Sequence, residues 1–352
     1  MEINATVDVT FTKNVNNVTY QNLFLQDTGI VYDGTGDTRK IWIDVNKDVT
    51  ENSGAAKEYT DVFLGSNTSK GHSINIMAQL EKTWEFGLYT SLAYNYGVAK
   101  SINDGQSSQN SSQWRVPNGN GRNNLDLGYS VYDLGHRIVA NVSYKINYSS
   151  FANTTIGLFY NGQSGERFSY GYDNGVAKNG GPAGDNIDRK HLTLLYVPKD
   201  SNDIVLKNIP NYTSAQQWAD LDAFIKDNKY LNDHRGEVVE RHAQRMPFEH
   251  IFDLKISQEF KFKVNTDREN RIQISLDVFN IGNMINKDWG RMHYGLGDYN
   301  TYRVLKFEGY VPGTKTPQYT YINKSGKDTW GIDDSGLQSS RWQAQIGVRY
   351  IF

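Results

Sequence analysis

The chain has 352 residues, of which 38% are hydrophobic and 13% aromatic, and its formal net charge is −2. This near balance of charge provides no basic surface for nucleic acid, and the absence of cysteine excludes a disulfide framework and thiolate metal sites. No run of about 18 apolar residues occurs, which excludes a membrane-spanning helix. A membrane barrel passes this test, because each strand needs only about ten residues and half of them can be polar.

Nine segments alternate apolar and polar residues, which is the pattern of a strand with one apolar and one polar face. The first two segments lie on either side of residues 14–17 and predict a hairpin. In chain order the nine segments cover residues 4–13, 18–24, 74–80, 88–96, 138–148, 156–160, 252–262, 272–278 and 341–352. Short and long connections alternate strictly between them, and the long ones span about 26–71, 100–134, 162–250 and 282–340.

This sorting of connections predicts an all-β fold, a transmembrane antiparallel β-barrel with short periplasmic turns and long extracellular loops. About eleven residues per strand, tilted by about 40°, cover about 27 Å, which is close to the apolar height of such barrels. Aromatic residues near the strand ends are expected in the interfacial girdles. They are Trp84, Phe86, Tyr148, Phe262 and Trp342. A soluble β-sandwich shares the strand pattern but not the sorted connections.

The last segment is expected to close the barrel, because it alternates up to an aromatic carboxy-terminal residue. Its apolar face consists of Trp342, Ala344, Ile346, Val348, Tyr350 and Phe352. If this strand descends to the periplasm, the first of nine strands descends too, and the chain begins outside. A complete bacterial barrel has an even strand number. We therefore expect a carboxy-terminal part of a larger barrel, with further residues upstream of Met1 or on a separate polypeptide.

Several segments together resemble the end of TonB-dependent outer-membrane transporters, and most closely the Oar-like and SusC-like subgroup. The segments are 159–170, 235–242, 252–256, 276–283 with 287–290, and 341–352. Within them the family-motif positions are Asn161, Gln163, Ser164, Asp277, Asn280 and Trp289. The resemblance implies a 22-stranded barrel, of which this chain would supply the last nine strands.

The resemblance also implies a function and its partners. It predicts a receptor in the outer membrane that binds an oligosaccharide, peptide or chelate and transports it with energy from the TonB complex. The implied partners are the lipid bilayer and lipopolysaccharide, the upstream barrel and plug, the barrel-assembly machinery and a surface lipoprotein. The sequence contains no plug, TonB box or carboxypeptidase-regulatory-like domain, so energised transport is not assigned to these residues alone.

Within the loops, residues 214–227 have helical spacing of apolar residues after a capping box at Ser214, and a second helix is expected near 237–244. The apolar stripe of the first helix is interpreted as packing of the loop on itself, with a ligand groove as the alternative. Tyrosine, tryptophan and asparagine in these loops have the chemistry to bind sugars or peptides, but a rigid outer loop contains them as well.

Four local patterns resemble binding or catalytic motifs only in part. Residues 33–37 lack the full calcium ligand series, and 119–124 lack the helix of a phosphate loop. His234 and His242 have no third metal ligand nearby in sequence, and Asp333 with Asp334 is typical of an acidic loop tip. We expect no cofactor, no metal and no catalysis. Two functional classes are therefore compatible with the sequence, a transporter barrel and a structural or adhesive β protein. An esterase or glycosidase barrel is a minor third possibility.

Overall fold

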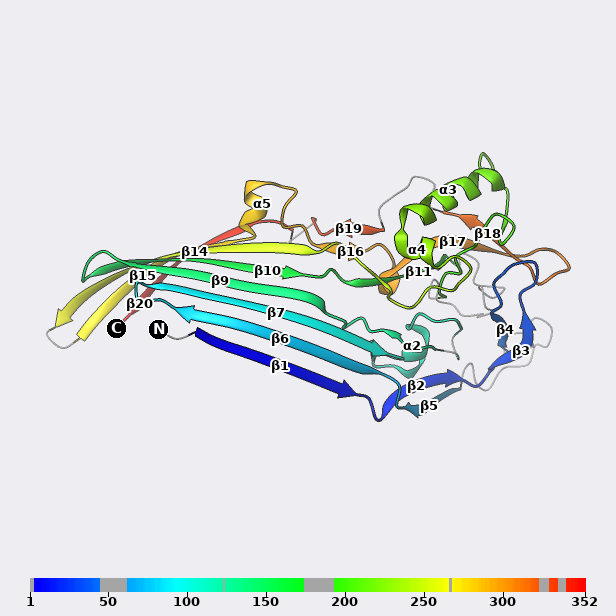
Figure 1. The fold of residues 1–352 in the computed structure, drawn as a ribbon, viewed down its shortest axis with the longest axis horizontal. Helices are drawn as coiled ribbons and strands as arrows, with labels where there is room; N and C mark the ends of the chain where they lie inside the picture. The colour runs from blue at the N-terminus through cyan, green and yellow to red at the C-terminus, as the bar shows by residue number, and fades with distance from the viewer. Residues whose placement is uncertain are drawn as a thin grey trace, which may run out of the picture.

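The computed structural model describes residues 3–44, 62–121, 123, 125–173, 193–265, 268–322, 329–334 and 340–352. Its main feature is a curved antiparallel sheet (Figure 1). Eight long strands form this sheet in the order β1 (Ile3–Lys13), β6 (His72–Thr83), β7 (Leu88–Ser101), β9 (Gly135–Asn147), β10 (Ala152–Gln163), β14 (Glu249–Asn265), β15 (Arg268–Phe279) and β20 (Gln343–Ile351). The two-residue β8 (Gly128–Tyr129) pairs with β7 and brings the sheet to nine strands.

The sheet has a turn end, where the connections are short, and a loop end, where they are long. Both termini of the chain lie at the turn end (Figure 1). Between β6 and β7 the turn is closed by a hydrogen bond from Trp84 N to Leu88 O, at 2.7 Å. Gly87 in this turn has φ +94°, and a Cβ there would lie 2.5 Å from the carbonyl oxygen of Lys145. Glycine is therefore required for the close approach.

The predicted first hairpin is wrong. β1 pairs with β6, in a register that places Val9 opposite Ile76 and Phe11 opposite Ile74. The second segment forms β2 (Asn17–Asn22), which pairs with β5 (Phe63–Thr68) outside the main sheet. The 11-residue β1 finds a partner of matching length in the 12-residue β6, whereas β2 has only 6 residues.

This correction changes the strand count and the direction of the first strand. The main sheet has eight long strands among the described residues, and the ninth is the short β8 rather than the second predicted segment. The first long connection begins after Lys13, not near residue 26. β1 runs from the turn end to the loop end, so the expectation that the first strand runs in the same direction as the last one is wrong.

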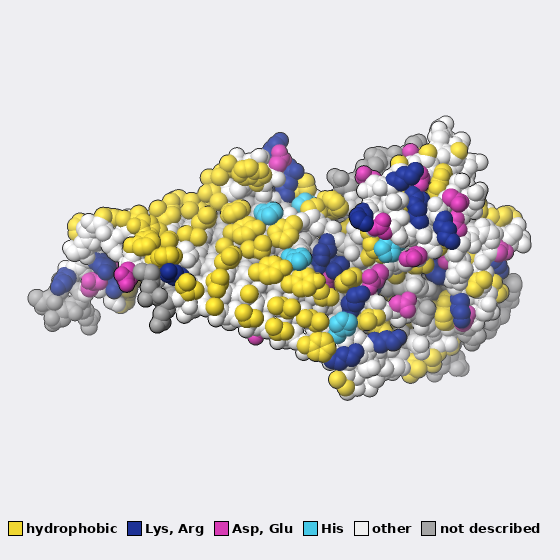
Figure 2. Space-filling view, in the orientation of Figure 1, with side chains coloured by type: hydrophobic (Ala, Val, Ile, Leu, Met, Phe, Trp, Pro, Cys, Tyr) yellow, Lys and Arg dark blue, Asp and Glu magenta, His cyan; other side chains and the backbone are white. Residues whose placement is uncertain are grey.

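One face of the sheet is a continuous band of exposed apolar side chains (Figure 2). Cross-strand registers place Leu158 opposite Leu254, Ile256 opposite Leu276, and Leu276 opposite Ile346. Ile346 is 76% exposed, and many other members of the band are exposed. Such an area in water is unfavourable, since covering one large apolar side chain stabilises by about 1.5–3 kcal/mol. The face is therefore suited to lipid.

No strand pairs with the outward edge of β1 or of β20 among the described residues, and these two strands are not paired with each other. The described sheet is thus open. The expected closed barrel and the total of 22 strands stay predictions. None of the described helices is both long and apolar enough to span a membrane.

The long connections fold into a second body at the loop end, the cap (Figure 1). It contains a five-stranded sheet in the order β12 (Val205–Leu206), β18 (Pro317–Tyr321), β17 (Thr301–Tyr310), β11 (Arg167–Asp173) and β13 (Gln244–Arg245). Against it pack α3 (Ser214–Asp227) and α4 (Lys229–Asp233). The remaining elements are β3 (Leu25–Val31) with β4 (Lys40–Asp44), α2 (Asn110–Arg115), α5 (Ile281–Ile285), β16 (His293–Gly295) with β19 (Trp330–Ile332), and the 3-10 helix η2 (Asp298–Asn300).

The helix predicted at 214–227 is confirmed, and its apolar stripe packs on the cap. Leu221 and Ile225 are fully buried in the same core as Phe168 and Tyr170. The capping residue is Thr213, one position earlier than expected, because Thr213 and Gln216 form the capping box.

The second predicted helix, near 237–244, is wrong. Val239 N donates to Leu195 O, which holds this segment extended, and His242 has φ +53°. The second helix is α4, which starts after the side-chain cap Asn228.

Candidate functional site on the polar face

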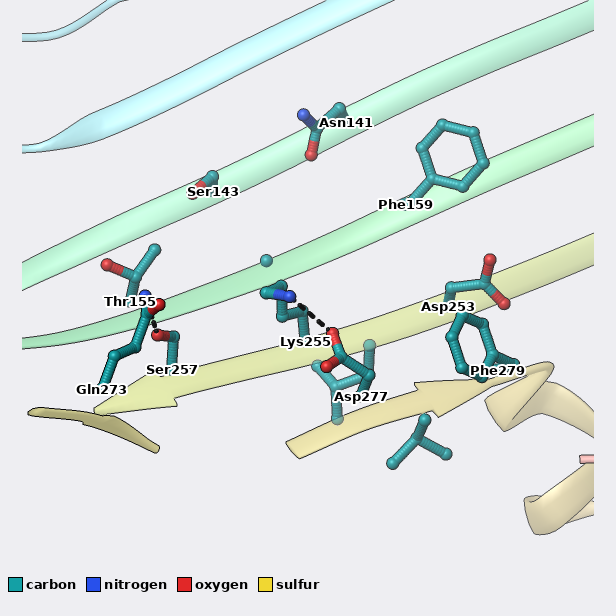
Figure 3. Close-up of a pocket in the computed structure, with 13 residues that line it drawn as sticks. Asn141, Ser143, Thr155, Phe159, Asp253, Lys255, Ser257, Gln273, Asp277 and Phe279 are labelled. Atoms are coloured by element: carbon teal, nitrogen blue, oxygen red, sulfur yellow. Dashed lines mark hydrogen bonds and ion pairs between the residues drawn. The ribbon is translucent and has the colours of Figure 1, made fainter. Parts of the chain in front are cut away.

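The face opposite the apolar band is polar, and a hollow of about 400 Å³ lies on it (Figure 3). β9, β10, β14 and β15 contribute its walls, because residues spaced by two point to the same side of a sheet. Its polar lining includes Asn141, Ser143, Thr155, Asp253, Lys255, Ser257, Gln273 and Asp277. The strand alternation thus collects hydroxyl, amide and charged groups from four strands at one place.

Three polar contacts organise the hollow. Lys255 Nζ lies 2.7 Å from Asp277 Oδ1, which joins β14 and β15 across the hollow (Figure 3). Gln273 Nε2 donates to Ser257 Oγ at 2.9 Å. Asp253 accepts a hydrogen bond from the backbone N–H of Asn280 at 2.8 Å. The Lys255 side chain is 58% exposed, so its ammonium remains available to a solute.

Two phenylalanine rings break the polar lining. Phe159 lies on β10 and Phe279 at the end of β15, and both are on the polar face with exposures of 37% and 45%. Figure 3 shows both rings beside Asp253 and the Lys255–Asp277 pair. Exposed aromatic rings next to fixed charges can hold a ligand that has both apolar and polar surfaces. Neither ring was among the predicted site residues, although an aromatic residue at a polar-face position of a strand is a signal visible in the sequence.

Ion pairs anchor the cap to the loop end of the sheet. The Asp133 carboxylate pairs with both Arg167 and Arg245 of the cap sheet. Its other oxygen, Oδ1, accepts a hydrogen bond from Ala99 N on β7, at 2.6 Å. A buried carboxylate needs such partners, because desolvation of an unpaired charge is very costly. The cap is therefore held on the sheet by charged groups as well as by its chain connections.

A second buried pair lies inside the cap. Asp37 and Arg39 form an ion pair at 2.5 Å, and Arg39 Nη1 donates to Leu194 O at 2.6 Å. Arg39 also donates to the Tyr172 hydroxyl, which accepts a hydrogen bond from Tyr196 N at 3.0 Å. Burial raises the pKa of Tyr172, so this hydroxyl stays protonated. The pair thus fixes the 33–37 turn to the cap core.

The same turn is held at its other end, at Asp33. This carboxylate accepts hydrogen bonds from Thr316 Oγ1 at 2.5 Å and Lys315 N at 3.3 Å. The acidic residues at 33 and 37 therefore have partners within the protein. Among the described residues no group of three or more His, Asp or Glu side chains is placed to hold a metal ion.

The two histidines of the predicted pattern lie in separate places. His234 ends α4, with Nδ1 2.7 Å from Tyr230 O. His242 is buried, and its Nδ1 lies 3.0 Å from Tyr129 O. Burial, together with the Arg241 guanidinium, lowers the pKa of His242 to about 4. Both rings serve packing and hydrogen bonding within the cap.

The other two partial motifs have different outcomes. Arg122 and Asn124 lie outside the described residues, whereas Gly119 forms a parallel bridge with Thr193. Asp333 and Asp334 follow β19, and Asp333 N donates to Met292 O at 2.9 Å.

The family-motif positions fall into two groups. Asn161, Gln163 and Ser164 lie at the loop end of β10. Ser164 N donates to His136 O at 2.8 Å and its hydroxyl accepts from His136 N at 3.0 Å, while Gln163 Nε2 donates to Glu249 Oε2 at 3.3 Å. Asn161 Oδ1 accepts a hydrogen bond from Arg137 Nε at 3.0 Å, so all three side chains join neighbouring strands.

The second group lies on and after β15. Asp277 belongs to the hollow through its pair with Lys255. Asn280 adopts a left-handed backbone with φ +52°, and its Nδ2 donates to Gly290 O at 2.8 Å. Trp289 is 56% exposed. Of the six motif positions, only Asp277 lines the hollow.

The carboxy-terminal strand has the face that was predicted for it. β20 pairs with β15, and Ile346, Val348 and Tyr350 are exposed on the apolar side. Ala344 lies on the same side, and Trp342 and Phe352 flank the strand at its two ends. Its role as the closing strand stays a prediction.

Comparison with known families is consistent with this arrangement of an apolar outer face and a polar inner face. Residues 29–288 match the family model described as an outer membrane beta barrel domain, which is more than half of the chain. No curated protein and no solved structure gives a significant match. The chain therefore belongs to the outer membrane beta barrel domain family and is located in the outer membrane as a multi-pass β-barrel protein.

Proposed function

We propose that the chain is the barrel part of a TonB-dependent transporter and that the hollow on the polar face binds the transported solute. The observation that carries this proposal is the arrangement of the Lys255–Asp277 pair beside Phe159 and Phe279. A lumen that only conducts water needs no aromatic rings, whereas a solute-binding wall combines rings with a few placed polar groups. Oligosaccharides, peptides and chelates all have this mixed surface.

The open edges of the sheet support the part of the proposal that concerns a larger barrel. In a bilayer the N–H and C=O groups on the outward edges of β1 and β20, with which no described strand pairs, each cost several kcal/mol unless another strand pairs with them. We infer that further strands and a plug complete the barrel, supplied upstream or by another polypeptide. The TonB complex would act on that plug, the assembly machinery would insert the barrel, and a surface lipoprotein would cover the cap.

The orientation follows from the connections. Short turns face the periplasm and long loops face outside in known barrels, so the cap would meet solutes first. The polar hollow would lie below it, in the half of the lumen nearer the cap. We propose binding and translocation as the activity of this chain and assign no catalytic step to it.

The test is solute binding by the full protein, purified from the outer membrane in detergent and titrated with panels of oligosaccharides, peptides and metal chelates. Lys255→Ala should weaken binding of the recognised solute at least tenfold. Lys261→Ala is a matched control, because Lys261 lies on the same strand and face, six residues nearer the turn end. Equal binding by the native protein and the Lys255 variant would exclude the hollow as the site.

Transport is tested in cells that depend on the recognised solute for growth. Deletion of the protein and inactivation of the TonB complex should each abolish that growth. Growth that continues without the TonB complex would reject energised transport.

A structural or adhesive role is the alternative, and the size and packing of the cap favour it. The cap has its own core, which includes Phe168, Tyr170, Leu221 and Val304. A rigid external body of this kind can bind a surface as well as a solute. The same deletion strain distinguishes the two functions. If the protein is an adhesin, the strain should lose surface attachment but grow normally on every solute.

A further inference from the structure

A second pocket lies on the opposite, apolar side of the sheet, at its loop end. Its volume is about 540 Å³. It forms where α5 and residues 286–293 fold back beside β14, and its main walls are Phe248, His250, Phe252, Trp289, Arg291 and His293. Because it opens on the face that contacts lipid, it is separate from the polar hollow.

The apolar part of this pocket continues the lipid-facing band. Phe252 belongs to the band, with its ring centroid 4.7 Å from that of Tyr160. Gly282 lies against it, since a Cβ on Gly282 would be 4.0 Å from the Phe252 ring. On the exposed side of α5, Met284 is 46% and Ile285 69% exposed. A helix that covers a lipid-facing strand and exposes apolar side chains is suited to contact with acyl chains.

The polar part of the pocket is rich in cationic and ionisable nitrogen groups. Arg291 forms an ion pair with Asp288, both at the pocket wall. His250 Nδ1 lies 2.8 Å from the Tyr160 hydroxyl, and His293 Nδ1 lies 3.7 Å from the buried carboxylate of Glu249. The Asp288 carboxylate holds Arg291 in place, and the Glu249 carboxylate accepts a hydrogen bond from His293 N at 2.8 Å, while His250 is held by a neutral hydroxyl.

The same loop end has more such groups along the apolar face. Strand parity places Lys13, His72, Lys100, His136 and His250 on this face, at or near the ends of β1, β6, β7, β9 and β14. Figure 2 shows Lys, Arg and His side chains gathered where the hydrophobic band meets the cap. This border is complementary to a layer of anionic headgroups, and the pocket lies within it.

We propose that the pocket binds a phosphorylated lipid of the outer leaflet. Its acyl chain would lie against Phe248, Phe252 and Trp289, and its phosphate would contact Arg291 and His250. A guanidinium suits this role because its parallel N–H groups match phosphate oxygens. The proposal rests on the orientation given under the proposed function, with the loop end outside, but it involves neither the hollow nor a solute.

The experiment measures lipid binding to the full protein in detergent by native mass spectrometry. The probes are a diphosphorylated, acylated glucosamine disaccharide, its dephosphorylated counterpart, and phosphatidylcholine. We expect the phosphorylated probe to bind at least fivefold more tightly than either of the others. Millimolar inorganic phosphate should not displace it, because the acyl chain contributes to binding. Equal binding of all three probes, or displacement by phosphate, would overturn the proposal.

Variants locate the site. Arg291→Ala and Trp289→Ala should each weaken binding of the phosphorylated probe at least fivefold, and Arg291→Lys should retain most of it. Lys255→Ala, on the polar face, is the control and should bind the lipid as the native protein does. If the Arg291 and Trp289 variants keep native affinity, the lipid binds elsewhere on the border and the pocket is rejected. Loss of solute binding in Lys255→Ala is a separate result that leaves the lipid site unaffected.

Discussion

Gln217 on α3 accepts a hydrogen bond from the backbone N–H of Tyr321 on β18, with 3.0 Å between Oε1 and N. The Gln217 side chain is fully buried, and its Nε2 donates to Lys207 O at 2.8 Å and to Tyr212 O at 3.0 Å. One amide thus joins the helix, the cap sheet and the segment between them. Neighbouring Gln216 has a different role, because it only completes the capping box with Thr213.

Replacing Gln217 with Ala should open the cap. Tyr321 N and Lys207 O lose their side-chain partner, and Tyr212 O keeps the hydrogen bond from Ile209 N at 3.3 Å. A buried group left without a partner costs about 1–3 kcal/mol. We expect amide hydrogen exchange in α3 and β18 to accelerate by about 100-fold or more. Gln216→Ala is the matched control and should cost only about 1 kcal/mol, or roughly fivefold in exchange. Similar exchange rates in the two variants would show that the Gln217 contacts do not stabilise the cap.

The cap should lose stability in acid through His242. Its folded pKa of about 4 lies below the ordinary 6.5, so folding favours the neutral ring. The stabilisation of the cap by the neutral ring is complete above pH 6.5, decreases as the pH falls from 6.5 to 4, and is lost near pH 4. This change in the free energy of unfolding amounts to about 3 kcal/mol. Asn is tolerated at φ +53°, so His242→Asn should remove this part of the pH dependence. Hydrogen exchange of the cap at pH 5 and 7, corrected for intrinsic rates, measures it. An unchanged pH dependence in the variant would assign it to other groups.

Asn280 should control the segment that carries α5. Asn280→Gly keeps the left-handed backbone and removes the hydrogen bond to Gly290 O, at a cost of about 1 kcal/mol. Asn280→Ala also strains the backbone, by roughly a further 1–2 kcal/mol. Trypsin cleavage at the exposed Lys287 should therefore be fastest in the Ala variant and slowest in the native protein. The same rate in both variants would mean that backbone strain at this position is small.

The two faces of β20 should respond differently to charge. Ile346→Arg places a guanidinium on the lipid-facing side near the middle of the strand, at a cost of about 2–4 kcal/mol. Gln345→Arg adds the same group to the polar face and should cost much less. Folding into lipid vesicles, followed by urea titration, compares the two. Equal destabilisation would contradict the assignment of the apolar face to lipid.

Local sequence patterns are sufficient to predict most of the strands and to tell which face of each strand is apolar. Period-two alternation depends only on backbone geometry, so it assigns Ile346 and Val348 to the apolar side whichever strand pairs with β20. Helix α3 was predicted for a similar reason, because its capping residues and apolar spacing are local. The lipid-facing character of the band follows from these local patterns summed over many strands.

The pairing of the segments, and the contacts between distant groups, depend on the complete fold. The choice of β6 rather than β2 as the partner of β1 depends on strand length and on contacts between residues about 70 positions apart. The Lys255–Asp277 pair beside Phe159, and the pocket under α5, also combine residues that are far apart in sequence. Local patterns do not encode such contacts, because they depend on the register of several strands and on the path of the loops at once.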